Sequence, residues 1–263
     1  MTTQAQLGDN TYTLERFPLD QKNRSLQAWD SGDEYLIDYV QEHYPNANSI
    51  LILNDSFGAL ACAFNTLTVY SVNDSYIAHQ ATRYNLQANE LSTDSLTQLD
   101  SLAALPNQVD LVILKVPRNL GYLQHQLAAI STALPADIDV IAGGKTKDIH
   151  NSTIKAFSQY IGETSTSLAV KKSRLIISKT SNLDKKAPFP VNWPLEGSEF
   201  ENQNHANVFS RDSLDIGARF FFNYLPQTSK ARSIIDLGCG NGVVGLMTLK
   251  RCPKAHVTFV DES

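Results

Sequence analysis

The amino-acid sequence predicts an α/β fold: a doubly wound parallel sheet that ends in an antiparallel hairpin, in tandem with the start of a second such sheet. Two observations predict the first sheet. Apolar strand-like runs alternate with helical patterns, and the last two apolar runs are joined by a turn too short for a parallel crossover. A strand–turn–helix–strand pattern at the end of the chain predicts the second sheet.

The elements of the first sheet follow from hydrophobic periodicity. Buried-strand patterns cover Ile50–Leu53, Val69–Val72, Leu111–Val116 and Asp139–Ala142. Helical patterns cover Phe57–Phe64, Tyr76–Asn89, Leu120–Leu134 and Ile149–Ile161. Strands that alternate with helices in this way predict parallel crossovers with helices on both faces of the sheet.

Two further patterns bound this sheet. Residues 1–30 form a polar lead-in, and Ser31 and Glu34 have the spacing of a capping box at the start of a helix. At the other end, Ser167–Lys171 and Arg174–Lys179 are strand-like runs joined by a very short turn. Such a turn joins antiparallel strands, so we expect an antiparallel edge.

The domain organisation follows from a change in composition. Residues 181–195 contain three prolines among polar residues, which is typical of a semi-rigid linker. We therefore expect a first domain over residues 1–180 and the beginning of a second over residues 196–263. A helix is expected early in the second domain, with Ser210 or Asp212 as its cap.

Bulk composition narrows the classes of function. The 263 residues include 22 basic and 27 acidic side chains, a net charge of −5, which disfavours a general nucleic-acid coat but allows a local basic patch. Cys62, Cys239 and Cys252 have no metal-ligand spacing and predict reduced thiols in a cytoplasmic protein. The sequence contains no apolar run of about 18 residues and begins with polar residues, so neither a membrane span nor a signal peptide is expected.

The end of the chain carries the most informative pattern. The apolar run Ser233–Leu237 predicts a buried parallel strand, and a helical pattern follows over Val243–Arg251. Between them stand glycines at alternate positions, in the order Asp-x-Gly-x-Gly-x-Gly. Glycine allows a sharp turn and the close approach of a nucleoside. A second strand ends in Asp261, whose carboxylate can accept hydrogen bonds from both ribose hydroxyls.

This turn admits three interpretations. Counted from Gly238, the dinucleotide spacing G-x-G-x-x-G places Val243 where the third glycine belongs, which disfavours an NAD-linked oxidoreductase. A glycine turn without a ligand is a second interpretation. The third rests on a resemblance: the order of the acids and glycines is similar to motif I of the class I S-adenosylmethionine (SAM) methyltransferases.

An internal comparison relates the two halves. Ser49–Gly58 aligns with Ser233–Gly242, and Val69–Ser75 aligns with Val257–Ser263, although any two α/β units share some similarity. The first copy lacks what a cofactor site needs, so we expect a degenerate methyltransferase-like domain that binds no SAM. The replacements are Asn54 for Gly238, Ser56 for Gly240, Ile52 for Asp236 and Asn73 for Asp261.

The whole chain resembles a bacterial family, the ribosomal RNA guanine-N2 methyltransferases with two tandem methyltransferase-like domains. The resemblance is carried by residues 204–219 and 235–242, and residues 28–36 and 51–60 are closer to the large-subunit branch of the family. It implies SAM as cofactor and a guanine of 23S rRNA as substrate. It also implies these cofactor-binding residues: Asp236, Gly238, Cys239, Gly240, Asn241 and Asp261.

The resemblance also sets the expected limits of the chain. The family's catalytic Asn/Asp-Pro-Pro-aromatic motif follows a fourth strand, and no such motif follows Asp261. We therefore expect a piece of a longer protein that contains no catalytic residue and is inactive alone. A non-catalytic RNA-binding platform is the alternative, and Cys239 is interpreted as small-residue filler of the turn rather than as a nucleophile.

Four cations of the first domain form the last prediction. Lys115 and Arg118 lie at the end of the expected strand Leu111–Val116, and Lys145 and Lys147 follow the expected strand Asp139–Ala142. Ligands bind at the carboxyl ends of strands in doubly wound sheets, and neighbouring strands lie about 4.8 Å apart. We expect the four to converge on one rim that binds rRNA phosphates, with an ordinary solvated edge as the alternative.

Overall fold

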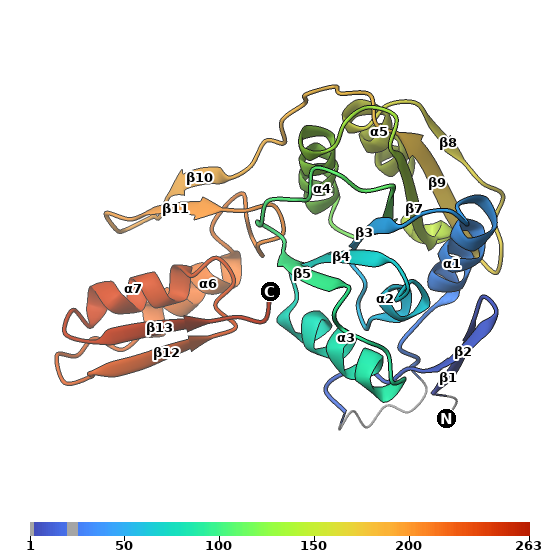
Figure 1. Ribbon diagram of the computed structural model, residues 1–263. Coiled ribbons are helices and arrows are strands. Elements are labelled where there is room, and N and C mark those ends of the chain that lie inside the picture. The colour runs from blue at the N-terminus through green and yellow to red at the C-terminus, as the bar shows by residue number, and fades with distance from the viewer. Residues whose placement is uncertain (1–2, 20–25) are drawn as a thin grey trace. The chain divides into compact units, whose positions relative to one another are not determined.

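The computed structural model describes residues 3–19 and 26–263 (Figure 1). The chain divides into two compact units, Met1–Lys186 (unit 1) and Ala187–Ser263 (unit 2). Among the described residues no helix has the length and apolar content that a membrane crossing requires.

Unit 1 is built on a seven-stranded sheet of order β5-β4-β3-β6-β7-β9-β8. Five strands run parallel, β9 is antiparallel to β7, and β8 is antiparallel to β9. The bounds are β3 Ser49–Leu53, β4 Thr68–Asn73, β5 Leu96–Asp100, β6 Leu111–Lys115, β7 Asp139–Lys145, β8 Thr164–Thr166 and β9 Ser173–Lys179. The predicted parallel sheet with an antiparallel end is confirmed.

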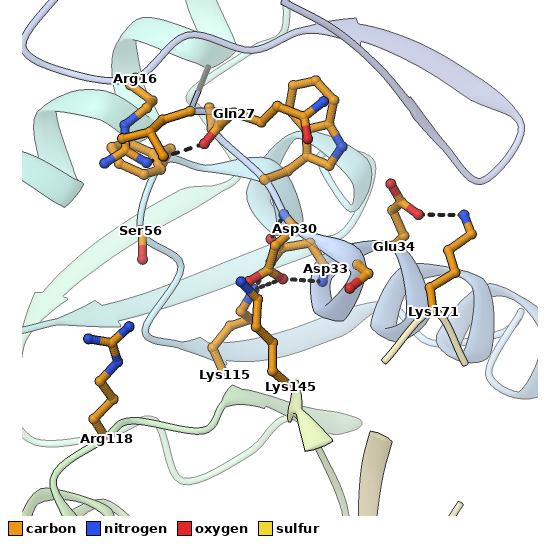
Figure 2. Close-up of a pocket in the computed structure, with 15 residues that line it drawn as sticks. Arg16, Gln27, Asp30, Asp33, Glu34, Ser56, Lys115, Arg118, Lys145 and Lys171 are labelled. Atoms are coloured by element: carbon orange, nitrogen blue, oxygen red, sulfur yellow. Dashed lines mark hydrogen bonds and ion pairs between the residues drawn. The ribbon is translucent and has the colours of Figure 1, made fainter. Parts of the chain in front are cut away.

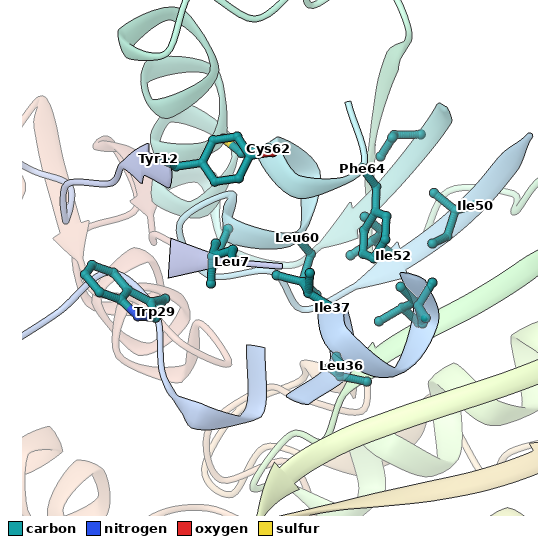
Figure 3. Close-up of a cluster of buried hydrophobic side chains, with 14 of the residues drawn as sticks. Leu7, Tyr12, Trp29, Leu36, Ile37, Ile50, Ile52, Leu60, Cys62 and Phe64 are labelled. Atoms are coloured by element: carbon teal, nitrogen blue, oxygen red, sulfur yellow. The ribbon is translucent and has the colours of Figure 1, made fainter. Parts of the chain in front are cut away.

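Helices cover both faces of this sheet, with α1, α2 and α3 on one side and α4 and α5 on the other (Figure 1). Their bounds are α1 Ser31–His43, α2 Ala59–Ala63, α3 Tyr76–Ala88, α4 Leu120–Ala133 and α5 Asn151–Tyr160, with a 3-10 turn at Thr146–Asp148. Because both faces are covered, all four residues from Ile50 to Leu53 are at most 1% exposed. Alternate residues, Ile50 and Ile52, join the cluster under α1 and α2 (Figure 3).

The start of the chain differs from the expected lead-in. It contains an antiparallel hairpin of β1 Gln4–Leu7 and β2 Asn10–Thr13, whose inward residues join the core of unit 1. The capping box of α1 is formed by Asp30 and Asp33, one residue earlier than the predicted Ser31 and Glu34. Asp30 lies in extended backbone just before the helix, which is the geometry that lets a side chain accept bonds from the first helical N–H groups.

The edge hairpin forms where it was predicted, with a shifted first strand. β8 ends at Thr166, and Val170 then pairs with Ser173 in an isolated bridge. Lys171 and Lys172 form the turn with φ of 46° and 65°. Two consecutive left-handed residues match the twist of an antiparallel hairpin.

Unit 2 contains two small sheets. One is an antiparallel hairpin of β10 Val191–Pro194 and β11 Glu201–Asn204, so β10 lies within residues 181–195, which were expected to be a linker. The other pairs β12 Ser233–Leu237 with β13 His256–Val260 in parallel.

Three helical segments complete unit 2, namely α6 Ile216–Phe221, a 3-10 turn at Phe222–Tyr224 and α7 Val243–Arg251. The cap of α6 is Asp215, which accepts a bond from the Ala218 N–H, rather than Ser210 or Asp212. The bounds of β12 and α7 are as predicted, but β12 is not buried within unit 2: Leu237 is 81% exposed.

Candidate functional site

The glycine turn of unit 2 connects β12 to α7 through left-handed backbone. Gly238, Gly240 and Gly242 have φ of 72°, 50° and 75°, a region that glycine enters without steric cost. The N–H groups of Gly238 and Cys239 both donate to the carbonyl of Val260, at 2.8 and 3.1 Å. The turn is therefore fixed against the carboxyl end of β13.

Two carboxylates fasten this turn from opposite sides. Asp261 Oδ2 accepts a 2.7 Å hydrogen bond from the Gly240 N–H, and its Oδ1 accepts one from the Glu262 N–H. These backbone donors lower the pKa of Asp261, so the exposed carboxylate stays charged. Asp236 Oδ2 accepts a 2.8 Å bond from the Gly245 N–H in the first turn of α7. One oxygen of Asp236 is thus used to hold the helix against the strand.

Gly245 is a site residue that the sequence prediction missed. A Cβ on it would lie 2.3 Å from the Phe259 ring and 2.9 Å from Asp236 Oδ2, so only glycine fits between helix and strand. Counted from the second glycine, Gly240, Gly242 and Gly245 do have the spacing G-x-G-x-x-G. Spacing alone therefore does not separate a dinucleotide site from a SAM site.

Cys239 lies in the turn as a neutral thiol. Partial burial raises its pKa, and the carboxylates of Asp261 and Asp236 raise it further. A thiol held protonated is a poor nucleophile, which supports its interpretation as a small residue of the turn.

The segment before α6 lies beside the turn. Phe209 is 71% exposed, so it does not belong to the core, and a Cβ on Gly240 would lie 3.7 Å from the Phe209 Cβ. Arg211 donates to the carbonyl of Ala206 and stacks its guanidinium over the Phe189 ring, 4.7 Å from its centroid. The segment thus forms an ordered wall next to Gly240.

In unit 1 the corresponding turn is closed by its own side chains. Asp55, 2% exposed, accepts hydrogen bonds from the N–H groups of Gly58, Ala59 and Ala61 at 2.9 to 3.1 Å. Asn54 exchanges two hydrogen bonds with Gln126 on α4. The N–H of the N-cap residue Gly58 and two N–H groups of the first turn of α2 are therefore already satisfied.

A hollow of about 820 Å³ lies in unit 1 at the carboxyl ends of β3, β6 and β7. Five basic and three acidic side chains line it, so it is positive in a chain whose net charge is negative. Arg118 and Lys145 point into it from neighbouring strand ends (Figure 2). Within residues 3–19 and 26–263 neither has a hydrogen bond or an ion pair through its side chain.

Lys115 lines the same hollow, and its ammonium group is held by two carboxylates. Its Nζ lies 2.6 Å from Asp33 Oδ1 and 2.9 Å from Asp30 Oδ1 (Figure 2). Burial opposes the charge on Lys115, but these two carboxylates outweigh it and raise the lysine's pKa. Burial raises the pKa of Asp33 to about 6 despite the lysine. The charge of Lys115 is thus engaged by two carboxylates in this structure, and its predicted role in RNA binding stays a prediction.

The structure brings together most of the predicted site residues. All six candidate cofactor residues lie in or against the glycine turn: Asp236, Gly238, Cys239, Gly240, Asn241 and Asp261. Three of the four candidate RNA-binding cations line the hollow. The fourth, Lys147, is exposed and is not among the residues that line it. The carboxylates around Lys115 were missed because Asp30 and Asp33 precede it by more than 80 residues in the chain.

Comparisons with known proteins identify the family. Residues 2–182 match the model of the RLMG N-terminal domain, and residues 199–263 match that of the methyltransferase small domain. Ribosomal RNA large subunit methyltransferase G of Pseudoalteromonas translucida is 72% identical over 100% of this chain and 69% of its own length. The protein of that name from Yersinia enterocolitica is 45% identical over 99% of the chain and 66% of its own length.

Among solved structures, a 16S rRNA N2 methyltransferase of T. thermophilus in complex with AdoMet and guanosine shares the fold, with a TM-score of 0.63 at 20% identity. It covers 86% of this chain and 62% of its own. The present chain thus spans about two thirds of the length of the relatives it matches. On the family models and the identity to these relatives, the chain belongs to the ribosomal RNA large subunit methyltransferase G family.

Proposed function

We propose that the protein methylates the exocyclic N2 amine of a guanine in 23S rRNA, with SAM as methyl donor, in the cytoplasm. The observation that carries this proposal is the glycine turn with both acids in register, in a chain 72% identical to a protein named for that ribosomal subunit. In the full-length gene product, unit 2 would hold the cofactor.

The residues of the turn fit a nucleoside cofactor. Asp261 accepts backbone N–H groups through both oxygens, and each carboxylate oxygen can accept a further bond, so ribose hydroxyls can bind without displacing the Gly240 N–H. A Cβ placed on Gly238 meets no atom within 4 Å, which leaves open space beside the turn. Asp236 keeps one oxygen for the amino group of the methionine part of SAM.

SAM supplies a methyl group on a positively charged sulfur, and the protein's task is alignment. In this chain the carboxylates of Asp261 and Asp236 and the left-handed turn would bind and orient the cofactor. We assign no catalytic residue to residues 1–263. The acceptors for the guanine amine are proposed to be the family's Asn/Asp-Pro-Pro-aromatic motif.

Unit 1 is proposed to hold the rRNA. Arg118 and Lys145 contribute unpaired charge to a positive hollow, and Lys147 would add an outer contact. Phosphate contacts of this kind give affinity that depends on salt and carries no sequence information. An RNA-binding platform without catalysis is the second candidate, favoured by the same hollow.

Cofactor binding is tested by calorimetry on the full-length gene product. Asp261→Ala should weaken SAM binding by at least ten-fold, because the ribose loses its charge-assisted acceptor. Glu262→Ala, at the next exposed position, is the matched control and should bind SAM as the unsubstituted protein does. Equal affinity for all three proteins would contradict the assignment.

The reaction itself is tested with tritiated SAM and purified 16S and 23S rRNA, followed by digestion to nucleosides. Label in N2-methylguanosine from 23S rRNA is expected. Label in another nucleoside or only in 16S rRNA would overturn the proposed substrate, and RNA binding without label would favour the platform.

The RNA surface is tested by charge reversal. Arg118→Glu with Lys145→Glu should weaken rRNA binding and reduce the salt slope by roughly one unit for each lost phosphate contact. Lys155→Glu with Lys186→Glu makes the same charge change at exposed positions outside the hollow. If the two double variants change the rRNA affinity and its salt slope equally, the hollow does not bind the RNA.

A further inference from the structure

An asparagine of the β10–β11 hairpin holds the cofactor turn. Asn202, 4% exposed, donates from Nδ2 to the carbonyl of Asn241 at 3.0 Å. Its neighbours Glu201 and Gln203 face solvent on the other side of β11. A strand that precedes the turn by almost forty residues therefore fixes the backbone of the turn itself.

The side chain of Asn241 contacts two other segments of unit 2. Its Nδ2 donates to the carbonyl of Ser210 at 3.3 Å, and its Oδ1 lies 3.4 Å from the Val243 N–H at the start of α7. Ser210 is a non-glycine residue in left-handed backbone, with φ of 51°, and follows Phe209 directly. These hydrogen bonds therefore connect Asn202, through Asn241, to the Phe209–Ser210 segment beside Gly240.

The inward face of β11 is not built for stability. Asn202 and Asn204 occupy its two buried positions, and within the described residues the Nδ2 of Asn204, 1% exposed, has no hydrogen-bond partner. Burying an amide without a full set of partners costs stability, which an apolar residue would avoid. A role in holding the turn accounts for Asn202 where packing does not.

The turn needs such support because its glycines are conformationally free. Gly238, Gly240 and Gly242 lose more backbone entropy on ordering than other residues would. Without the hydrogen bond to the carbonyl of Asn241, the free-energy cost of ordering the turn would reduce the affinity for the ligand. A turn that is already ordered before binding gives a higher affinity.

We propose that Asn202 is a positioning residue for SAM binding, which orders the glycine turn through the carbonyl of Asn241. The proposal rests on the proposed function, since it requires that SAM binds at this turn. Asn202 itself makes no contact with the reacting atoms and acts through the backbone of Asn241.

The first test is Asn202→Asp, measured by calorimetry with SAM at pH 8 and at pH 5.5. At pH 8 the aspartate is ionised, cannot donate and faces a carbonyl oxygen, so affinity should fall about ten-fold. Burial against a carbonyl raises the pKa of an introduced carboxyl. The protonated acid formed at pH 5.5 can donate again, and the affinity should return to within about two-fold of the unsubstituted protein at that pH.

Gln203→Asp is the matched control, with the same charge change on the exposed face of the same strand. It should bind SAM like the unsubstituted protein at both pH values. Asn202→Asp with unchanged affinity at pH 8, or with a loss that pH 5.5 does not reverse, would overturn the proposal.

A second variant covers the case in which the aspartate disrupts folding. Asn202→Leu keeps the branched shape of the side chain and introduces no charge, so the protein should still fold with a cooperative transition while SAM affinity falls about ten-fold through the lost donor. A variant that keeps full affinity shows that Asn202 does not position the turn. If the unsubstituted protein does not bind SAM, the proposed function fails instead, so the two failures are distinguishable.

Discussion

The two strand–turn–helix segments of the molecule share a backbone frame and differ at its centre. Asn54 and Gly238 open the two turns in left-handed backbone, with φ of 67° and 72°, and Gly58 and Gly242 close them at 85° and 75°. Between them Gly240 is left-handed, whereas its counterpart Ser56 has a negative φ. The two turns therefore share the backbone conformation at both ends and differ at the central position, which in unit 2 is proposed to face the cofactor.

The side chain that contacts this central peptide differs between the two copies. In unit 2 Asp261 accepts a bond from the N–H of Gly240, while in unit 1 the aligned Asn73 donates from Nδ2 to the carbonyl of Asp55 at 3.1 Å. That carbonyl and the N–H of Ser56, which aligns with Gly240, belong to the same peptide unit. The peptide is therefore flipped between the two copies, and the flipped orientation suits Asn73, because an amide can donate to the carbonyl and a carboxylate cannot.

The aspartate that accepts hydrogen bonds from the start of the helix also occupies a different sequence position in the two units. In unit 2 it stands on the strand, as Asp236, and bonds only Gly245 in α7. In unit 1 it stands inside the turn, as Asp55, and bonds the aligned Ala61 together with two earlier N–H groups. The proposed cofactor turn of unit 2 and the self-capped turn of unit 1 thus differ in their capping acid and share the strand–turn–helix fold.

The largest effect should come from filling the space at Gly245. Gly245→Val puts a branched side chain where even a Cβ would lie 2.3 Å from the Phe259 ring. We expect destabilisation by about 3 kcal/mol, with loss of SAM binding, measured by denaturant unfolding and calorimetry. The aligned exchange in unit 1, Ala61→Gly, should cost only about 1 kcal/mol. Equal effects at the two positions would show that the two frames do not differ in packing.

Removing the displaced acid should have the next largest effect. Asp55→Ala leaves three N–H groups at the start of α2 without their acceptor in a site that is 2% exposed. Unit 1 should lose about 2 kcal/mol of stability, seen in its unfolding transition, while SAM affinity stays unchanged. If SAM then shifted the melting temperature of unit 1, the turn would be a blocked site rather than a lost one.

Sequence patterns predicted those parts of the molecule that follow local rules. β12 and α7 have their predicted bounds, because apolar runs and helical periodicity are local signals. β5 was missed because Leu96–Asp100 mixes polar and apolar residues, as an edge strand can. β10 was missed because it lies within residues 181–195, whose prolines and polar residues are typical of linkers, and its partner β11 contains no apolar residue.

The site was predicted less completely, because its contacts join distant parts of the chain. The acids and glycines of the turn were found from one short pattern, whereas Asn202 and the pair of Asp33 with Lys115 depend on tertiary contact. Asp55 lay within the aligned segment, but a sequence cannot show that its side chain turns back onto α2. Burial and ion pairing of this kind become visible only in the folded chain.

An exchange of the side chains at the strand tips tests the peptide flip. Asn73→Asp should destabilise unit 1 by about 1 kcal/mol, because the carboxylate cannot donate to the Asp55 carbonyl. Asp261→Asn should leave the stability of unit 2 nearly unchanged, since the amide oxygen can still accept from Gly240, but it should weaken SAM binding through the lost charge. Thermal melts measure the two stabilities, and calorimetry measures the SAM affinity. An Asn73→Asp variant with unchanged stability would show that this side chain does not determine the orientation of the peptide.

The smallest effect on stability should come from Gly238→Asn, which gives unit 2 the residue that unit 1 has in the same left-handed conformation. Asparagine tolerates this region, and a Cβ at Gly238 meets no atom within 4 Å, so the free energy of unfolding should fall by less than about 1 kcal/mol. The same open space is where SAM is proposed to bind, and the added amide would occupy part of it. SAM affinity should therefore fall by about ten-fold or more while the unfolding transition hardly moves. A Gly238→Asn variant that binds SAM normally would show that the cofactor approaches the turn from another side.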